Sequence, residues 1–469
     1  MKSMGLKVFM LSIILVVSLT TPVLRIFPYT FAQMNQQDSL LKSLTLPLAI
    51  QIALNENPVI KAAHFQVDAS VAQLTQARSG FFPQVFISEA FNHTNNPMWA
   101  FGTKLNQEVI SQADFNPDKL NDPDAINNFT TAVTMDWTLF DPVRTWFPWQ
   151  QSRQNLKASE YMLDRTRQEV IARTITAYTG VLLAEEHLNV VRQSLNTALS
   201  HLKLVRDRYE NGFIVKSDFL RMQVRVGELE QHLIESESNS EIARVNLTAT
   251  MGLPVERRFD LTSSFYQESD NHKWEIQGSV EKWVETALSH RPDLETLRYQ
   301  EKIAEKEIQK SKSAHLPSIH IIGNYEMNSE NFNDMAENYT LGAVAQLNLF
   351  SGNRLRAGTK EAKAALARVK TLITAMENSI HVEIRQAFYQ TQSAGKRIQV
   401  AKTAVIQADE GLRIARNRYE NGLLTLVELL DAQSAQQQAC MNYAGALHDY
   451  KTATAQLALA SGTMNADFK

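Results

Sequence analysis

The chain has 469 residues, of which 44% are hydrophobic, and its 47 basic and 50 acidic residues give a net charge of −3. This balance lacks the basic excess of a protein that binds nucleic acid. Only 17 Gly and 13 Pro are present, which favours long uninterrupted elements, and the single cysteine, Cys440, excludes an internal disulfide and a thiolate zinc site. Composition therefore predicts a large, helix-rich protein.

The first 32 residues have the pattern of a secretory signal peptide. Lys2 and Lys7 precede an apolar run at 8–19, and Thr30-Phe31-Ala32 offers a cleavage site with small residues. The alternative is an uncleaved membrane anchor, although the apolar run is short for a span of about 20 residues. We expect an exported protein whose mature chain starts at Gln33.

The remaining chain is a tandem duplication. Segment 206–212 (RDRYENG) recurs at 416–422 (RNRYENG), an offset of 210, whereas Asn57-Pro58 and Arg291-Pro292 are 234 apart. The same two offsets relate further pairs in the same order, which indicates a repeat. The change in offset predicts a longer loop in the first half, around 93–128.

We expect a first repeat at 33–252, a linker at 253–280 in an equatorial region, and a second repeat at 281–469. Each repeat is predicted to hold helices, then two strands, then a long helical hairpin. The expected strands lie near 83–92, 129–140, 317–328 and 339–350, and the expected hairpins at 149–251 and 353–462.

The strands are predicted from period-two alternation. Val133, Met135 and Trp137 alternate with Thr134 and Asp136, so one face is apolar and the other polar. Strands of this length suit a tilted membrane span, but four of them cannot close a barrel, and open edges are not tolerated in lipid. Three copies of the chain would supply twelve strands. A soluble sheet capping a coiled coil is the alternative.

The hairpins are predicted from a heptad pattern with 4-3 spacing, which is typical of coiled-coil packing. Its positions in the two repeats are Ala184, Leu188, Val191, Leu195, Ala198, Leu202, Val205 and Tyr209, and Ala394, Ile398, Ala401, Val405, Ala408, Leu412, Ala415 and Tyr419. An Asn-Gly pair then turns the chain, because glycine tolerates the left-handed geometry at a helix end.

In this ordered set of features, the chain resembles the TolC family of outer-membrane efflux proteins. The carrying motifs are the duplication itself, the Asn57-Pro58 and Arg291-Pro292-Asp293 pair, Phe82-Pro83 before a strand, and the Arg-Tyr-Glu-Asn-Gly turns. The resemblance implies an α+β membrane protein whose protomers, each with long coiled-coil helices and four strands, form a homotrimer. The trimer would build a 12-stranded β-barrel in outer-membrane lipid and an α-helical barrel in the periplasm.

The resemblance also implies partners that open the closed periplasmic tip. A periplasmic adaptor protein, coupled to an inner-membrane transporter, would dock on the helix turns. The turn residues are Arg208, Asn211, Gly212 and Phe213 in the first repeat, and Arg418, Asn421, Gly422 and Leu423 in the second. The alternative is a plain helical turn in which Asn-Gly supplies only geometry. Arg208 and Arg418 are the better candidates for contact with the adaptor or for bridges between helices.

An acidic pore constriction is implied at Glu428 and Asp431. These residues are three apart and so share one helical face, and three chains would stack two acidic rings that attract cations. The alternative is an ordinary solvated face. The first repeat has Asp218 and Arg221 at the equivalent positions, so the two halves differ there.

Together these features predict a passive exit duct of a tripartite efflux or type I secretion system. The alternative is a non-conducting trimeric coiled-coil protein with a structural or adhesive role. Neither an enzyme nor a cofactor is expected, because the one phosphate-loop-like segment, Gly352 to Gly358 before Thr359-Lys360, has the wrong spacing and the reverse order of its last two residues.

Overall fold

The computed structural model describes residues 44–261 and 276–466, so the predicted signal peptide and part of the predicted linker lie outside it. Contacts divide the chain into two units. The described part of the smaller unit is Leu44 with residues 258–261, where the Leu44 N–H donates to the Asp260 carbonyl oxygen at 2.9 Å. The helices and strands found within residues 44–261 and 276–466 belong to the larger unit.

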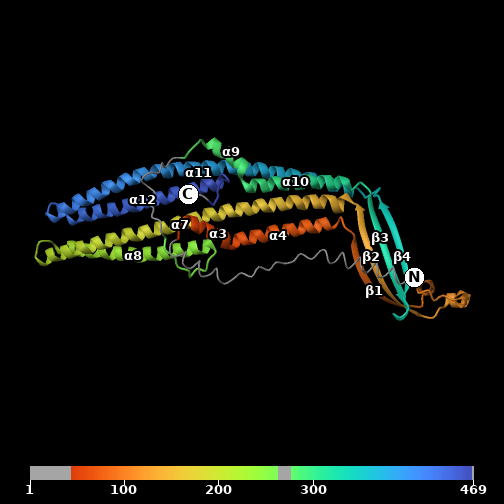
Figure 1. Cartoon of the computed structure of the whole chain (residues 1–469). Coiled ribbons are helices and arrows are strands. Elements are labelled where there is room, and N and C mark those ends of the chain that lie inside the picture. Colours follow the sequence, from red (N-terminus) through yellow and green to blue (C-terminus); the bar gives the residue numbers. More distant parts are fainter. Residues whose placement is uncertain (1–43, 262–275, 467–469) are drawn as a thin grey trace. The chain divides into compact units, whose positions relative to one another are not determined.

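The two halves of the larger unit share the order of their main elements, two helices, two strands and a long helical hairpin, and the first half has further short helices between and after its strands (Figure 1). The first half contains α3 (Leu46–Glu56), α4 (Pro58–Ser79), β1 (Gln84–Thr94), α5 (Pro97–Asn106), η2 (Gln112–Phe115), α6 (Pro117–Asn121), β2 (Ile126–Phe140), η3 (Pro142–Trp146), α7 (Phe147–Glu210) and α8 (Lys216–Met251). The second half contains α9 (Val280–His290), α10 (Pro292–Ser313), β3 (Ser318–Ser329), β4 (Ala336–Gln346), α11 (Arg354–Glu420) and α12 (Leu426–Ala460).

Local sequence explains where the helices begin. Asn57 precedes α4, and its side-chain oxygen accepts a hydrogen bond from the Val59 N–H at 2.8 Å, while Pro58 occupies the first helical position, where no N–H is needed. Pro292 has the same position in α10. The Asn-Pro and Arg-Pro motifs that mark the repeat are therefore boundaries between helices.

The four strands form one antiparallel sheet in the order β1-β2-β3-β4. The two hairpins have the same register, because Gln84 pairs with Asp136 and Ser318 pairs with Gln346, and these pairs are related by the offsets 234 and 210. The β2–β3 pairing joins the two repeats inside one chain.

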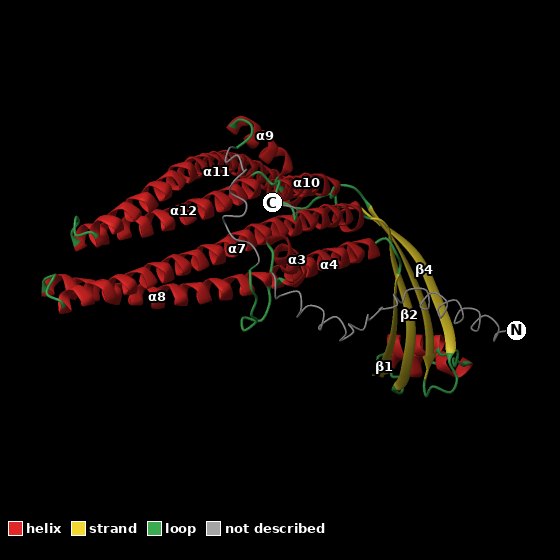
Figure 2. Cartoon of the chain, turned by 60° about the vertical axis from the view of Figure 1, so that its left-hand side comes forward, coloured by secondary structure: helices red, strands yellow, loops and turns green. Residues whose placement is uncertain are grey.

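The long helices pack in pairs, α7 with α8 and α11 with α12, and α7 also packs on α12 (Figure 2). Every heptad position predicted on α7 and α11 is buried or half-buried, so the 4-3 pattern does face other helices. At the tip, Leu195, Met222, Tyr419 and Leu429 belong to one hydrophobic cluster that all four helices share. The fold is the predicted α+β arrangement of long hairpins and four strands.

Strand β4 differs from the strand predicted near 339–350, because it ends at Gln346. Among the described residues it pairs with β3 alone, and β3 begins at Ser318, the partner of Gln346. The equivalent strand β2 continues to Phe140 because β3 pairs with it beyond a bulge, where Phe140 lies opposite Ile319.

The predicted loop around 93–128 also differs, because it contains the helices α5, η2 and α6. Asn96 and Asn116 cap α5 and α6 with their side-chain oxygens, and a proline follows each of them at the first helical position. These Asn-Pro pairs are helix-start signals that the sequence contained.

Candidate functional site

The turns between the long helices have the same backbone geometry in both repeats. Gly212 and Gly422 adopt positive φ angles of 79° and 74°. Each glycine N–H donates to a tyrosine carbonyl oxygen, and the next N–H, that of Phe213 or Leu423, donates to an arginine carbonyl oxygen, which is a Schellman motif. The Asn-Gly pairs therefore supply the geometry of both turns.

The residue after each glycine projects from the turn. The exposed fractions of Phe213 and Leu423 are 80% and 73%, so these apolar side chains are not used to seal their own helix ends. Asn211 and Asn421 each donate from the side-chain amide to a carbonyl oxygen one turn back, at 2.7 Å, and so stabilise the helix ends. Each turn therefore presents one apolar side chain on a rigid base.

Arg208 connects the two hairpins of the chain. Its guanidinium donates to the Tyr419 carbonyl oxygen at 3.1 Å and to the Glu420 carbonyl oxygen at 2.7 Å, and it lies over the Tyr419 ring at 5.1 Å from the ring centroid. Its repeat copy, Arg418, is exposed. The structure thus places Arg208 in a bridge between helices and leaves Arg418 at the surface.

Glu428 and Asp431 lie one turn apart on α12, and both are exposed. The Glu428 carboxylate accepts hydrogen bonds from the Thr425 N–H at 2.9 Å and from the Thr425 hydroxyl at 2.7 Å, which completes a capping box. These bonds, together with the nearby charge of Arg418, lower the pKa of Glu428. The Thr-x-x-Glu spacing in the sequence signals this cap, which gives Glu428 a local structural role that was not predicted for it.

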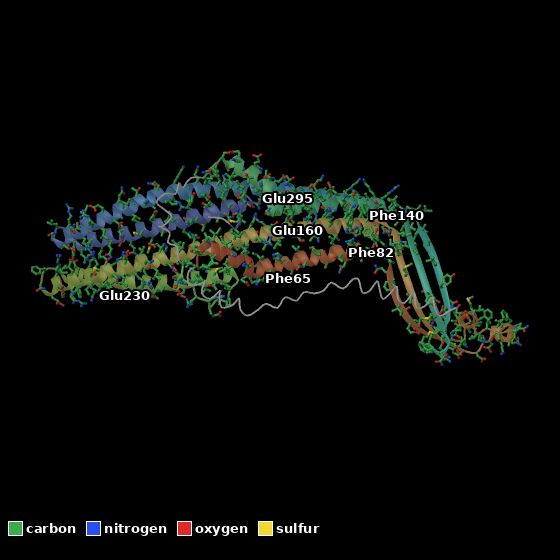
Figure 3. The ribbon with its side chains drawn as sticks, viewed as in Figure 1. Phe65, Phe82, Phe140, Glu160, Glu230 and Glu295 are labelled. Carbon is green, nitrogen blue, oxygen red and sulfur yellow. The ribbon has the colours of Figure 1, made fainter. Side chains whose placement is uncertain are left out.

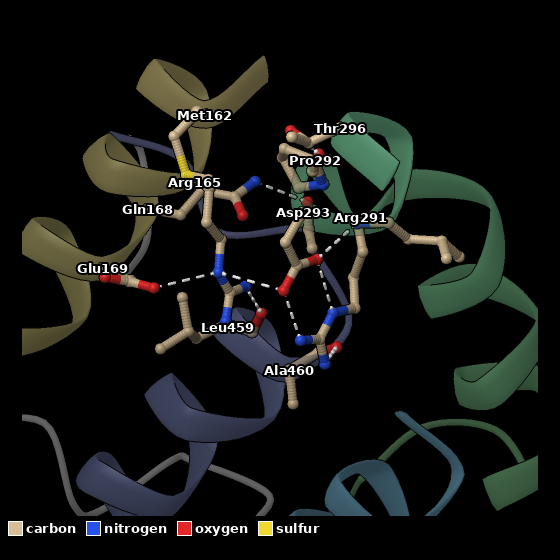
Figure 4. Close-up of polar contacts among 12 residues, drawn as sticks. Met162, Arg165, Gln168, Glu169, Arg291, Pro292, Asp293, Thr296, Leu459 and Ala460 are labelled. Atoms are coloured by element: carbon tan, nitrogen blue, oxygen red, sulfur yellow. Dashed lines mark hydrogen bonds and ion pairs between the residues drawn. The ribbon is translucent and has the colours of Figure 1, made fainter. Parts of the chain in front are cut away.

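A buried ion network links the halves of the chain in the middle of the helical region (Figure 4). Arg291 is only 2% exposed and pairs with Asp293 at 2.6 Å and with Glu383, while Arg165 lies 3.6 Å from Asp293. Burial alone would raise the pKa of Asp293, but the hydrogen bonds from Arg291 and the charge of Arg165 outweigh it and lower that pKa. The network fixes α10 against α7 and α11.

Each repeat marker also contacts the end of the return helix in its own half. The Asn57 side-chain amide donates to the Thr250 carbonyl oxygen at 2.7 Å, and Arg291 donates to the Ala460 carbonyl oxygen at 3.3 Å. Thr250 and Ala460 are 210 residues apart, so Asn57 and Arg291 perform the same task in the two halves. The Asn-Pro and Arg-Pro motifs thus hold the end of each return helix.

Aromatic residues gather where the strands meet the helices. Phe81 lies edge-to-face against Trp146 and Trp149, with ring centroids 6.4 and 6.1 Å away, and the Trp137 indole N–H donates to the Phe81 carbonyl oxygen at 3.1 Å. Figure 3 shows Phe82 and Phe140 at this junction. Amphipathic rings grouped at one level are typical of a membrane–water interface.

The two faces of the sheet differ in polarity. One face presents Thr130, Thr134, Asn324 and Asn328, and hydrogen bonds cross it from Thr134 to Asn324 at 3.0 Å and from Thr130 to Asn328 at 3.1 Å. The opposite face presents the aromatic and aliphatic residues of the alternating pattern. They are Val85, Ile87, Phe91, Phe129, Val133, Met135, Trp137, Ile321, Tyr325, Tyr339 and Leu341.

Within 44–261 and 276–466, no helix has both the length and the apolar character to cross a bilayer. The same residues contain no cluster of three or more His, Cys, Asp or Glu side chains arranged to hold a metal ion.

A model of the outer membrane efflux protein family matches residues 49–253 and 283–463. The chain belongs to this family. The alkaline protease secretion protein AprF of Pseudomonas aeruginosa is 22% identical over 422 residues, covering 88% of this chain and 83% of that protein. The outer membrane protein TolC of Vibrio cholerae is 22% identical over 88% of this chain and 89% of its own.

The fold agrees with this assignment. The crystal structure of the CmeC outer membrane channel of Campylobacter jejuni matches with a TM-score of 0.73 at 16% identity, over 90% of this chain and 87% of that one. Membership in the outer membrane efflux protein family makes the chain an outer-membrane exit duct that extends into the periplasm, and it does not support an enzymatic or adhesive role.

Proposed function

We propose that three copies of the chain form the exit duct of a tripartite efflux or type I secretion system. The duct conducts substrate passively from an inner-membrane transporter, coupled through a periplasmic adaptor, across the periplasm and the outer membrane. The observation that carries this proposal is the two-faced sheet whose outer strands, β1 and β4, have a neighbour on one side only in the described chain. Such edges have to be paired in lipid.

The repeat supplies the rule for pairing these edges. Inside one chain, Val133 of β2 lies opposite Tyr325 of β3. Adding 210 to the first position and subtracting 234 from the second gives Ala343 of β4 opposite Phe91 of β1 in the next copy. Three copies joined in this way give twelve strands, a number within the range of outer-membrane barrels, with the polar face lining the lumen.

Some apolar residues that are buried between helices within the chain have exposed copies in the other repeat. Leu430 and Ala444 of α12 are buried against the rest of the chain, at 9% and 0% exposure, whereas their repeat copies on α8, Leu220 and Ile234, are exposed at 47% and 68%. Val190 of α7 is buried, whereas its copy Val400 on α11 is 71% exposed. Because α7 packs on α12 inside the chain, α11 of one copy is expected to pack on α8 of the next.

The turns at the tip offer a docking surface for the periplasmic adaptor. Phe213 and Leu423 are exposed apolar side chains on rigid turns, and a trimer would present six of them in a ring. We propose that the adaptor docks on this ring, with the exposed Arg418 as a polar contact. The aromatic junction around Phe81 would then mark the boundary between outer-membrane lipid and the periplasm.

The acidic pair is proposed to narrow the pore. Glu428 and Asp431 are exposed next to the tip in one chain, and three copies would place six carboxylates in two rings. The capping box holds the Glu428 carboxylate against the start of α12. The ring of three Glu428 carboxylates is therefore expected to be wider than it would be if the side chains extended freely into the pore.

Conductance of the purified protein in planar bilayers tests this function. We expect reproducible trimer-sized conductance that lanthanum ions block. Replacing Glu428→Gln together with Asp431→Asn is expected to raise the half-blocking concentration by about tenfold, because multivalent cations lose the charged rings. Glutamine retains the capping box, so the turn is preserved.

The matched control is Glu281→Gln on α9, which removes an exposed carboxylate outside the tip and is expected to leave the block unchanged. A protein that forms trimers without conductance would favour the structural alternative. Conductance with unaltered block in the double variant would remove Glu428 and Asp431 from the pore.

A further inference from the structure

The first repeat carries a helical insert that the second lacks. Residues 95–125, which connect β1 to β2, contain α5, η2 and α6, whereas β3 and β4 are joined directly by residues 330–335. The insert lies at the end of the sheet opposite the long helices (Figures 1 and 2). In a protein whose helices extend into the periplasm, this end faces the cell exterior.

The insert is anchored on the polar face of the sheet. Gln107 is only 6% exposed, and its side-chain amide donates to the Asn127 carbonyl oxygen and to the Asn128 side-chain oxygen, both at 2.8 Å. Asn128 in turn donates to the Asn328 side-chain oxygen at 2.8 Å. Asn128 and Asn328 are buried and belong to the polar face, so α5 ends over that face.

A second anchor joins the insert to the far strand of the sheet. The Asn338 side-chain amide of β4 donates to the Asn106 carbonyl oxygen at 3.1 Å. Asn338 is also on the polar face, opposite Glu326. The last turn of α5 therefore contacts β2 and β4, on either side of β3, and crosses the sheet on the polar side.

The insert has an internal structure of its own. Lys104 forms an ion pair with Asp114 at 2.8 Å, and Asp114 also accepts hydrogen bonds from the Ser111 N–H and hydroxyl in a capping box. The hydrogen bonds from Lys104 and Ser111 hold the pKa of Asp114 well below its usual range. Phe101 packs edge-to-face on Phe115, with ring centroids 5.7 Å apart. These contacts give the insert a fixed position over the strand ends.

We propose that the insert is a size-selecting constriction at the outer mouth of the duct. This inference rests on the proposed trimer, in which the polar face lines the lumen. Three inserts anchored on that face project over the mouth and narrow it, independently of the periplasmic tip. Gln107 is a positioning residue, because it holds the insert without contacting the transported substrate.

Labelling from outside intact cells tests the constriction. In a Cys440→Ser background, Ser88→Cys places a thiol on the polar face in the middle of β1. A small charged maleimide is expected to label it, whereas a large PEG-maleimide labels it slowly. When residues 95–125 are replaced by the sequence of 330–335, labelling by the large reagent is expected to rise by about tenfold or more, since the lumen width then sets access.

Three further variants keep the test decisive. Gln107→Ala loosens the anchor while retaining the insert, and it is expected to raise labelling by the large reagent in the same direction. Asp334→Cys, in the exposed connection between β3 and β4, reports reagent access outside the lumen and is expected to be labelled equally in every background. The conservative change Gln107→Glu cannot donate to both oxygens and is expected to behave like Gln107→Ala.

Gel electrophoresis of unheated samples, which detects trimers, distinguishes failure of the constriction from failure of the proposed duct. If trimers form and the large reagent labels Ser88→Cys equally with the intact, the loosened and the shortened insert, the constriction is wrong and the duct stands. If the intact protein gives no trimers, the proposed function and this inference both fail.

Discussion

At the residue scale, two glycines allow the repeat halves to close on themselves. Gly252 and Gly462 have positive φ angles, and a Cβ atom on Gly252 would lie 2.7 Å from the Glu56 carbonyl oxygen. Gly212 also has a positive φ, but a Cβ atom there would meet nothing within 4 Å. Substitution of Gly212 would therefore cause backbone strain alone, whereas substitution of Gly252 would cause backbone strain and a steric clash.

We expect Gly212→Ala to cost about 1 kcal/mol, since alanine is strained at positive φ. Gly252→Ala should cost several times more, because backbone of the α3–α4 junction has to move as well. Thermal unfolding of the two variants, followed by circular dichroism, measures the difference. Equal losses would mean that the contact between Gly252 and the Asn-Pro motif does not stabilise the fold.

The buried Arg291 gives a second prediction at this scale. Arg291→Ala leaves Asp293 partly buried without its closest partner and should cost about 3–5 kcal/mol of unfolding free energy. The control is Arg413→Ala, whose exposed pair with Glu410 should contribute little to stability, because solvent screens it. Denaturant unfolding compares the two variants, and similar losses would contradict the structural role of the network.

The same network should make the protein acid-sensitive. The pKa of Asp293 is lower in the folded chain than its ordinary value of 3.8. Its contribution to stability is therefore fully present above that value, and it is lost as the pH falls below 3.8 toward the lower folded pKa. An Asp293→Asn variant should lose stability at neutral pH and show a weaker dependence on pH in this acid range.

At the element scale, each face used between hairpins inside the chain has an exposed copy. We expect Ile234→Glu on α8 to prevent assembly while leaving the helical content of the protomer intact, because a charge would be buried only in the trimer. Glu230→Gln, a change at an exposed acidic residue of the same helix, is the control. Analytical ultracentrifugation in detergent reads out the mass, and normal trimers of Ile234→Glu would contradict the proposed packing of α11 on α8.

Elements with a strong period were predictable, and those shaped by neighbours were not. The 4-3 spacing from Ala184 to Tyr209 predicted the buried seam of α7, and the alternation around Val133 predicted β2. The early end of β4 depends on where its partner β3 begins, which no local pattern contains. The insert helices had Asn-Pro starts, but their apolar residues are too few for a clear period.

For the candidate site, the sequence predicted the type of turn but not the contacts that its residues make. The Asn-Gly turns followed from the need for positive φ. The different environments of Arg208 and Arg418 could not be predicted, because the same five-residue motif surrounds both of them. Only the packing of one hairpin on the other places Tyr419 beside Arg208. Likewise, the cap that Glu428 forms with Thr425 follows from the turn geometry as well as from the spacing.

At the scale of the whole molecule, the proposed duct requires the next copy to repeat the contacts that join the two halves of one chain. The register across that junction is the most direct test. In a Cys440→Ser background, Ala343→Cys with Phe91→Cys should form disulfide-linked dimers and trimers in the outer membrane. Ala343→Cys with Ile87→Cys, which is out of register by four residues, should remain uncross-linked. Absence of links in the first pair, or equal links in both pairs, would contradict the account.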